Sequence, residues 1–137
     1  MKRMSVNPSQ WGLAYLMDQG EVVEGATRLL RCSGQVDLQE DADAPLGVTV
    51  SAPGDMRRQI GIALGNVDTI LRDAGMGRRN LVFLRFFTTD VDAFLEHYDV
   101  YAEWIRPAGI RPPQSLLGIR QLALPDLMVE IEAEAAA

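Results

Sequence analysis

The sequence contains one cysteine and one histidine among 137 residues, and this scarcity excludes several kinds of site. Cys32 alone cannot form an internal disulfide bond or a cysteine-cluster metal site. His97, without a second histidine or a cysteine partner, cannot anchor an ordinary zinc site. We therefore expect neither a metal nor a cofactor. Cys32 is interpreted as a buried, unreactive thiol and His97 as a surface or packing residue.

Basic residues and long apolar runs are also scarce. The chain has 13 Lys and Arg against 19 Asp and Glu, which gives a net charge of −6. Nucleic-acid binding depends first on basic residues that neutralise phosphates, and anionic membranes attract basic surfaces, so neither partner is expected. No run approaches the roughly 20 apolar residues of a membrane span, and residues 1–8 do not resemble a secretory signal. The expected location is the cytoplasm.

Apolar residues make up 47% of the chain and charged residues 23%, which is enough apolar material for one packed core. A chain of this length is usually one domain, so residues 1–137 are predicted to form a single α+β domain. Residues 37–54 are acidic and rich in turn residues, which indicates an exposed loop. The other predicted elements are short strands at 12–17 and 21–24, strands at 27–33, 81–89, 114–122 and 127–133, and helices at 55–74 and 90–106.

Two segments carry the strongest patterns. In the helix at 55–74, apolar residues recur every three or four positions, Asp55 stands at the start, and Gly75 follows the end. The strand at 81–89 is apolar at odd and even positions alike, so it should be a central strand that is covered on both faces. The two predicted helices cover only one face. We therefore expect another subunit to cover the second.

Several segments resemble the RidA/YjgF family, which includes proteins once labelled L-PSP endoribonucleases. The likeness extends over about residues 10–135, and the order of the segments makes it specific. It is carried by Ser33-Gly34-Gln35 at a strand end, by a helix with Gln59 and Asn66 that ends at Ala74-Gly75, by Phe87-Thr88-Thr89-Asp90, and by Val129-Glu130-Ile131-Glu132-Ala133.

The resemblance implies a chorismate-mutase-like subunit, in which a six-stranded mixed sheet carries two helices on one face. It also implies a homotrimeric barrel, with the sheets facing inward and a ligand cleft at each of the three interfaces. The family's best-known chemistry is the hydrolysis of reactive enamines and imines to 2-oxo acids and ammonia. An arginine in a Pro-Ala-Arg-Ser segment holds the substrate carboxylate in that reaction.

Here the matching segment is Pro112-Pro113-Gln114-Ser115, so Gln114 stands where the arginine is expected. A guanidinium binds a carboxylate through its positive charge and two parallel hydrogen bonds, whereas a glutamine amide is neutral. Loss of the guanidinium would weaken carboxylate binding by about 2–3 kcal/mol. Two further positions also depart from the imine-hydrolysing members. Tyr98 replaces an asparagine and Leu116 replaces a cysteine that is often present there.

Other site positions match the family. Ser33 and Gly34 correspond to hydroxyl and backbone groups of the cleft, and Glu130 to the glutamate that handles the attacking water. Tyr15 corresponds loosely to a pocket tyrosine. Without the resemblance, Glu130 would be interpreted as part of a solvated strand face with Glu132 and Glu134.

Two questions stay open at this level. Arg85 is either an interface arginine paired with a carboxylate or a positive charge for a relocated ligand site. The protein is either a divergent hydrolase of small enamine, imine or carbonyl metabolites, with Glu130 as its base, or a non-catalytic trimer that senses a metabolite or docks on a partner. Ribonuclease activity is disfavoured by the acidic charge and by the lack of a basic, aromatic stripe.

Overall fold

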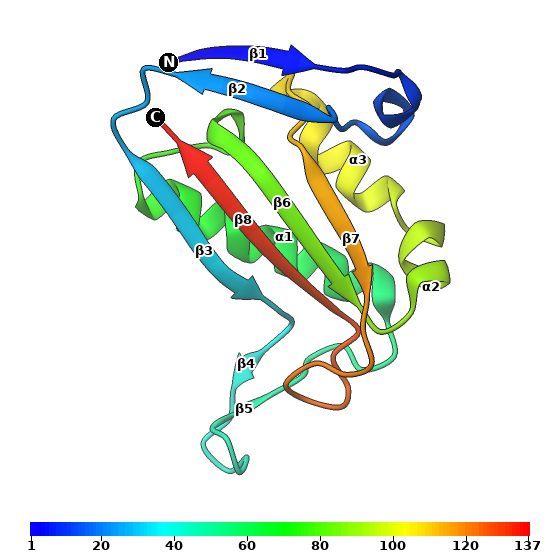
Figure 1. The fold of residues 1–137 in the computed structure, drawn as a ribbon. Helices are drawn as coiled ribbons and strands as arrows, with labels where there is room; N and C mark the ends of the chain where they lie inside the picture. The colour runs from blue at the N-terminus through cyan, green and yellow to red at the C-terminus, as the bar shows by residue number, and fades with distance from the viewer.

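The computed structural model describes all residues from 1 to 137, and a mixed sheet with helices on one face forms its centre (Figure 1). The elements in chain order are β1 (Lys2–Val6), the 3₁₀-helix η1 (Trp11–Tyr15), β2 (Gly20–Glu24), β3 (Leu29–Gln35), β4 (Gln39–Glu40), β5 (Val48–Thr49), α1 (Met56–Asp73), the 3₁₀-helix η2 (Arg78–Asn80), β6 (Leu81–Thr88), α2 (Val91–Glu96), α3 (Asp99–Ile105), the 3₁₀-helix η3 (Arg106–Ala108), β7 (Gln114–Gly118) and β8 (Val129–Ala136). The α+β class is as predicted. None of the helices combines the length and the hydrophobicity that a membrane span requires.

The central sheet has the strand order β3-β8-β6-β7. β8 pairs antiparallel with both β3 and β6, while β6 and β7 are parallel because α2 and α3 connect them. β8 lies between β3 and β6 and alternates between buried and half-buried residues, as its sequence predicts. The C-terminal strand therefore becomes a central strand of the sheet.

Six strands of five residues or more are present, and two of them stand apart from the central sheet. β1 and β2 form a separate antiparallel hairpin, which lies across the end of the sheet where β6 begins (Figure 1). Arg3 joins the hairpin to β6, since its guanidinium donates to the carbonyl of Leu81 at 2.5 Å and is paired with Glu21. Side-chain contacts thus replace the ladder of hydrogen bonds that a continuous six-stranded sheet would have.

The helix α1 forms where the apolar stripe predicts it. Asp55 caps its first turn, because its carboxylate accepts a hydrogen bond from the backbone N–H of Arg58 at 3.0 Å. Gly75 follows the helix with a φ of +69°, the left-handed conformation that glycine adopts most easily. Ile60, Ala63 and other residues of the stripe are fully buried in the main core.

The two faces of β6 differ in their surroundings. Leu84 and Phe86 are buried against the helices, whereas Arg85 and Phe87 on the opposite face are only half-buried. No helix covers this second face, which we call the open face. It carries Phe83, Arg85 and Phe87 of β6 together with Glu130, Glu132 and Glu134 of β8.

Three predicted elements differ in the structure. Residues 12–17 form the 3₁₀-helix η1 and the turn after it, not a strand, because Leu16 adopts a left-handed φ of 55° that ends any extended backbone. The predicted helix at 90–106 is divided into α2 and α3 at His97, which leaves the helical conformation. The predicted loop at 37–54 contains the small β4–β5 hairpin, which projects from the body of the molecule (Figure 1).

Candidate functional site

The predicted site residues form two groups in the structure. Tyr98, Gln114 and Leu116 line one pocket, at the edge of the sheet where β7 meets the junction of α2 and α3. Ser33, Gly34 and Glu130 lie on the neighbouring strands β3 and β8. β6 separates the two groups within the sheet.

The two groups also face opposite sides of the sheet. Gln114 is paired with Leu84, whose side chain is buried beneath the helices. Glu130 is paired with Phe87 and therefore points to the open face. Directly paired residues of neighbouring strands share a face, and successive residues of one strand alternate. One chain therefore cannot bring Gln114 and Glu130 together in a single cleft.

The pocket beside β7 has a volume of about 300 Å³ and is mostly apolar. We call it the β7 pocket, and it is lined by Trp11, Tyr15, Met17, Leu95, Tyr98, Gln114 and Leu116. Gln114 is its one strongly polar residue, and none of the seven carries a charge. The sequence indicated Tyr98, Gln114 and Leu116, and Tyr15 more loosely. Nothing in the sequence indicated Trp11, Met17 or Leu95, because only the folding of the chain brings them to the pocket.

A short chain of hydrogen bonds fixes the orientation of the Gln114 amide. The hydroxyl of Tyr98 donates to the backbone carbonyl of Tyr15 at 2.6 Å. A hydroxyl has one hydrogen, so the same oxygen must act as the acceptor toward Gln114, whose Nε2 donates to it at 2.5 Å. The other end of the amide, Oε1 of Gln114, is then a buried acceptor without a partner. Such a group is destabilising by about 1–3 kcal/mol.

Burial also determines the ionisation of Tyr98. Desolvation raises the pKa of its phenol to about 12, against a smaller opposing effect of the hydrogen bond with Gln114. Tyr98 is therefore a neutral hydroxyl near pH 7. The β7 pocket is uncharged as well as apolar.

A buried carboxylate holds the N-terminal segment against this pocket. Asp18 is 3% exposed and accepts hydrogen bonds from Ser5, Asn7 and Arg111, the last at 2.9 Å. Burial by itself raises the pKa of Asp18, but these three donors together hold it below its ordinary value. Because Asp18 follows η1 closely and Arg111 precedes β7, the ion pair positions Tyr15 beside the β7 pocket.

On the other side of the sheet, the side chain of Glu130 lies over Gly34. The pairing of β3 with β8 is irregular between Cys32 and Gln35, and this bulge brings the backbone of Gly34 beneath the carboxylate. Burial raises the pKa of Glu130, and the negative charge of Glu132 raises it further. Such a carboxylate is a stronger base than an ordinary one.

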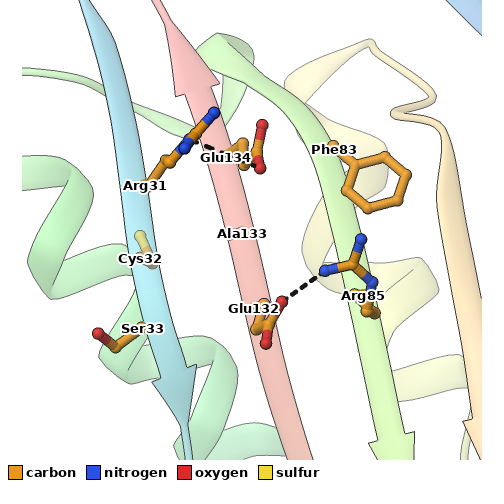
Figure 2. A pocket seen from close by; sticks show the side chains of 8 residues that line it. All are labelled: Arg31, Cys32, Ser33, Phe83, Arg85, Glu132, Ala133 and Glu134. Atoms are coloured by element: carbon orange, nitrogen blue, oxygen red, sulfur yellow. Dashed lines mark hydrogen bonds and ion pairs between the residues drawn. The ribbon is translucent and has the colours of Figure 1, made fainter.

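Arg85 is paired with Glu132 on the open face. Figure 2 shows the two side chains pointing toward each other from β6 and β8, with Nη1 of Arg85 at 2.6 Å from Oε2 of Glu132. The guanidinium also lies 5.1 Å from the ring centre of Phe83. The predicted pairing with a carboxylate is therefore present within one chain. Arg85 supplies no free positive charge to the β7 pocket, which lies beyond the opposite face of the sheet.

Around this ion pair the open face is hollowed. The hollow has a volume of about 290 Å³ and is bordered by Ser33 and by a second, longer ion pair between Arg31 and Glu134 at 3.9 Å. Cys32 is also buried nearby, and burial raises the pKa of its thiol, in agreement with an unreactive cysteine. No three His, Cys, Asp or Glu side chains lie close enough together to hold a metal ion.

Comparison with known proteins places the chain among relatives of one kind. A family model described as endoribonuclease L-PSP matches residues 19–137. A RutC family protein of Aquifex aeolicus (strain VF5) is 34% identical over 67 residues, which are 49% of this chain and 53% of that protein. The match thus spans about half the length of this curated relative.

Solved structures extend the likeness to the whole fold. YyfB of Yersinia pestis, a protein of unknown function from the conserved Rid family, is 25% identical, with a TM-score of 0.80 over 100% of both chains. TdcF of E. coli, solved with bound serine, is 26% identical, with a TM-score of 0.66 over 88% of this chain and 87% of that one. On the family match and on this agreement of folds, the chain belongs to the RidA/YjgF family.

Proposed function

We propose that the protein is a homotrimer of single-domain subunits that binds a small metabolite in clefts between them. Each cleft combines the β7 pocket of one subunit with Ser33, Gly34 and Glu130 of its neighbour. The observation that carries this proposal is the placement of Gln114 and Glu130 on opposite faces of one sheet. If both belong to one site, a second copy must supply one of them.

The open face supports assembly through the sheets. Phe83 and Phe87 are half-buried there, and Leu117 of the adjacent strand is 39% exposed. Burying such apolar surface against a second copy would stabilise the assembly by roughly 25 cal/mol per Å². The ion pair of Arg85 and Glu132 is already formed within each chain, so these two charges would enter the interface as a compensated pair.

The chemistry best supported at the cleft is hydrolysis of an imine. Water would add to the imine carbon while Glu130 accepts one of its protons. Glu130 would then pass this proton to the nitrogen, which gives a carbinolamine. A second proton would move from the carbinolamine hydroxyl to the nitrogen through Glu130 as the C=O bond forms and the C–N bond breaks, and the products would be a carbonyl compound and ammonia. The raised pKa of Glu130 supports its role as the base, because a carboxylate with a higher proton affinity removes a proton more readily.

The β7 pocket lacks the means to hold a carboxylate substrate. Its polar residue is the neutral Gln114, and one N–H of that amide is engaged with Tyr98. We therefore expect little or no activity on 2-aminoacrylate-type substrates, which carry a carboxylate. The serine bound to TdcF supports a small metabolite as the kind of ligand taken in this fold, although that amino acid itself carries a carboxylate.

A non-catalytic role is the second candidate. The hydrogen bond from Gln114 to Tyr98 favours it, because this contact occupies the side chain that stands at the position of the family's substrate-binding arginine. A trimer of this kind would sense a metabolite or dock on a partner without catalysing a reaction.

An ammonia-release assay separates the two candidates. The native protein and a Gln114→Arg variant would be given 2-aminoacrylate, generated in the assay by a dehydratase. Low native activity that rises in Gln114→Arg would indicate a hydrolase whose substrate preference has changed. No activity in either protein would favour the non-catalytic role. Native turnover as rapid as that of arginine-bearing relatives would contradict the prediction that Gln114 weakens the binding of carboxylate substrates.

A further inference from the structure

The β7 pocket has chemical features that define the ligand more narrowly than its family does. It is small, since ligand pockets usually range over about 300–1,000 Å³ and this one lies at the lower end. Six of its seven lining residues are hydrophobic. A ligand that fits would be a compact molecule with a largely apolar body.

No unpaired arginine or lysine of the chain lines the pocket. Arg111, the nearest arginine along the chain to Gln114, is paired with the buried Asp18 at 2.9 Å. Arg31 and Arg85 lie on the open face, which a neighbouring copy would bring toward the pocket, but each is paired with a glutamate of its own chain. A carboxylate that entered the β7 pocket would lose its hydration without gaining a cation, which is unfavourable.

The one polar side chain in the wall has an unused acceptor. The chain of donors through Tyr98 to the carbonyl of Tyr15 engages one N–H of the Gln114 amide and leaves Oε1 unpaired. This oxygen is buried, and no group of the chain donates a hydrogen bond to it. Because an unpaired buried acceptor is destabilising, a ligand N–H that bonds to Oε1 would relieve this destabilisation. The pocket is therefore complementary to a hydrogen-bond donor.

The aromatic residues favour a donor that is positively charged or strongly polarised. The rings of Trp11 and Tyr15 lie 6.4 Å apart, and those of Tyr15 and Tyr98 lie 6.0 Å apart, so the three form a row along the pocket. Aromatic rings attract ammonium groups through their quadrupole. The net charge of −6 also favours cations over anions in the surrounding solution.

From these contacts we infer that the β7 pocket selects small apolar molecules that carry an N–H donor and no carboxylate, namely primary amines or the N-unsubstituted imines derived from them. The N–H would donate to Oε1 of Gln114. This inference rests on the proposed function, because it assigns a substrate class to the same pocket. With this selectivity, an imine hydrolase would act on imines formed by amine oxidation, not on imines formed in amino-acid breakdown.

Binding of three matched probes tests the inference. Benzylamine has the N–H donor, benzoate has the carboxylate, and benzyl methyl ether has the same ring without a donor. Titration calorimetry on the native protein should show that benzylamine binds about tenfold more tightly than either of the others, the effect of one good hydrogen bond. Gln114→Leu should abolish this preference, whereas Gln114→Arg should reverse it in favour of benzoate. Gln121→Leu, at an exposed glutamine outside the pocket, is the control and should leave the preference unchanged.

A second arm distinguishes amines from imines. Benzylamine and an amine oxidase would generate the imine in the assay, and release of ammonia would be followed with and without the protein. Faster release identifies the imine as a substrate, while tight benzylamine binding without acceleration identifies the amine as the ligand. Benzoate binding as tightly as benzylamine to the native protein would overturn the inference and leave the trimeric cleft standing. Absence of binding by all three probes would also overturn it, whereas the trimeric cleft is judged separately by the mass of the assembly.

Discussion

The carboxylate of Glu130 lies directly over the α-carbon of Gly34, with no room for a side chain between them. A β-carbon built on Gly34 would overlap the carboxyl end of Glu130 and would lie 2.7 Å from its Cγ. The absence of a side chain at position 34 is therefore what allows Glu130 to occupy this place on the open face. The Ser-Gly-Gln segment and the glutamate of the C-terminal strand form one structural unit.

Gly34→Ala should displace Glu130 while the fold remains intact. The displaced carboxylate would be better hydrated, so its raised pKa should return toward the ordinary value of 4.5, as measured by NMR titration. Gly61→Ala is the matched control, since a β-carbon there meets nothing within 4 Å and should stabilise α1 by roughly 0.5–1 kcal/mol. An unchanged Glu130 pKa in Gly34→Ala would contradict the contact.

Glu130→Gln should make the folded protein slightly more stable at pH 7. The folded state binds the proton of Glu130 more tightly than the unfolded state, so the native protein loses stability as pH rises from the unfolded pKa through the raised folded pKa. The variant does not have this loss. Its advantage should be below about 1 kcal/mol, because water still screens the half-buried group, and should vanish at pH 3. Denaturant unfolding at the two pH values checks both the sign and the pH window.

Asp18→Asn should weaken the attachment of the N-terminal segment. The change removes the buried charge that accepts hydrogen bonds from Ser5, Asn7 and Arg111. Because Arg111 is itself 43% exposed and stays hydrated, the expected loss is about 2 kcal/mol in the free energy of unfolding. In the native protein the pKa of Asp18 is lowered, so its stabilisation is present above the unfolded pKa and is lost as pH falls through the folded one. Asp73→Asn, at an exposed carboxylate, should change the unfolding free energy little. Equal losses in the two variants would contradict this role of Asp18.

Two neighbouring tyrosines should respond oppositely to loss of the hydroxyl. Tyr98→Phe removes the link between Gln114 and the carbonyl of Tyr15 and should destabilise the protein by about 1–2 kcal/mol. Tyr101→Phe removes a buried hydroxyl that has no partner and should be neutral or stabilising. Thermal unfolding of both variants measures the difference. A larger loss in Tyr101→Phe than in Tyr98→Phe would show that the hydrogen-bond chain is not as described.

Local patterns were sufficient to predict much of the fold. The helix α1 and the strands β6 and β8 follow directly from the spacing of their apolar residues. The N-terminal region was less predictable, because β1 is held in place by Arg3, whose partner carbonyl belongs to residue 81. The break at His97 was equally hidden, since both halves continue the apolar pattern of one helix.

The sequence indicated candidate site positions but not how they are arranged. The resemblance to the family identified Gln114 and Glu130, and nothing local in the sequence shows that they face opposite sides of the sheet. The unpaired Oε1 of Gln114 depends on a bond from Tyr98 to Tyr15, which is 83 residues away in the chain. Contacts of this kind arise only when the fold brings distant segments together.

The molecular mass of the native assembly tests the central claim most directly. Light scattering coupled to size-exclusion chromatography, at micromolar concentration and moderate salt, should give three times the chain mass of 15.1 kDa. A neighbouring copy is needed to bring a Glu130 to the Gln114 side of a cleft, and the resemblance to the family implies that there are three copies. A stable species of 15.1 kDa, unchanged by dilution, would contradict the proposed site.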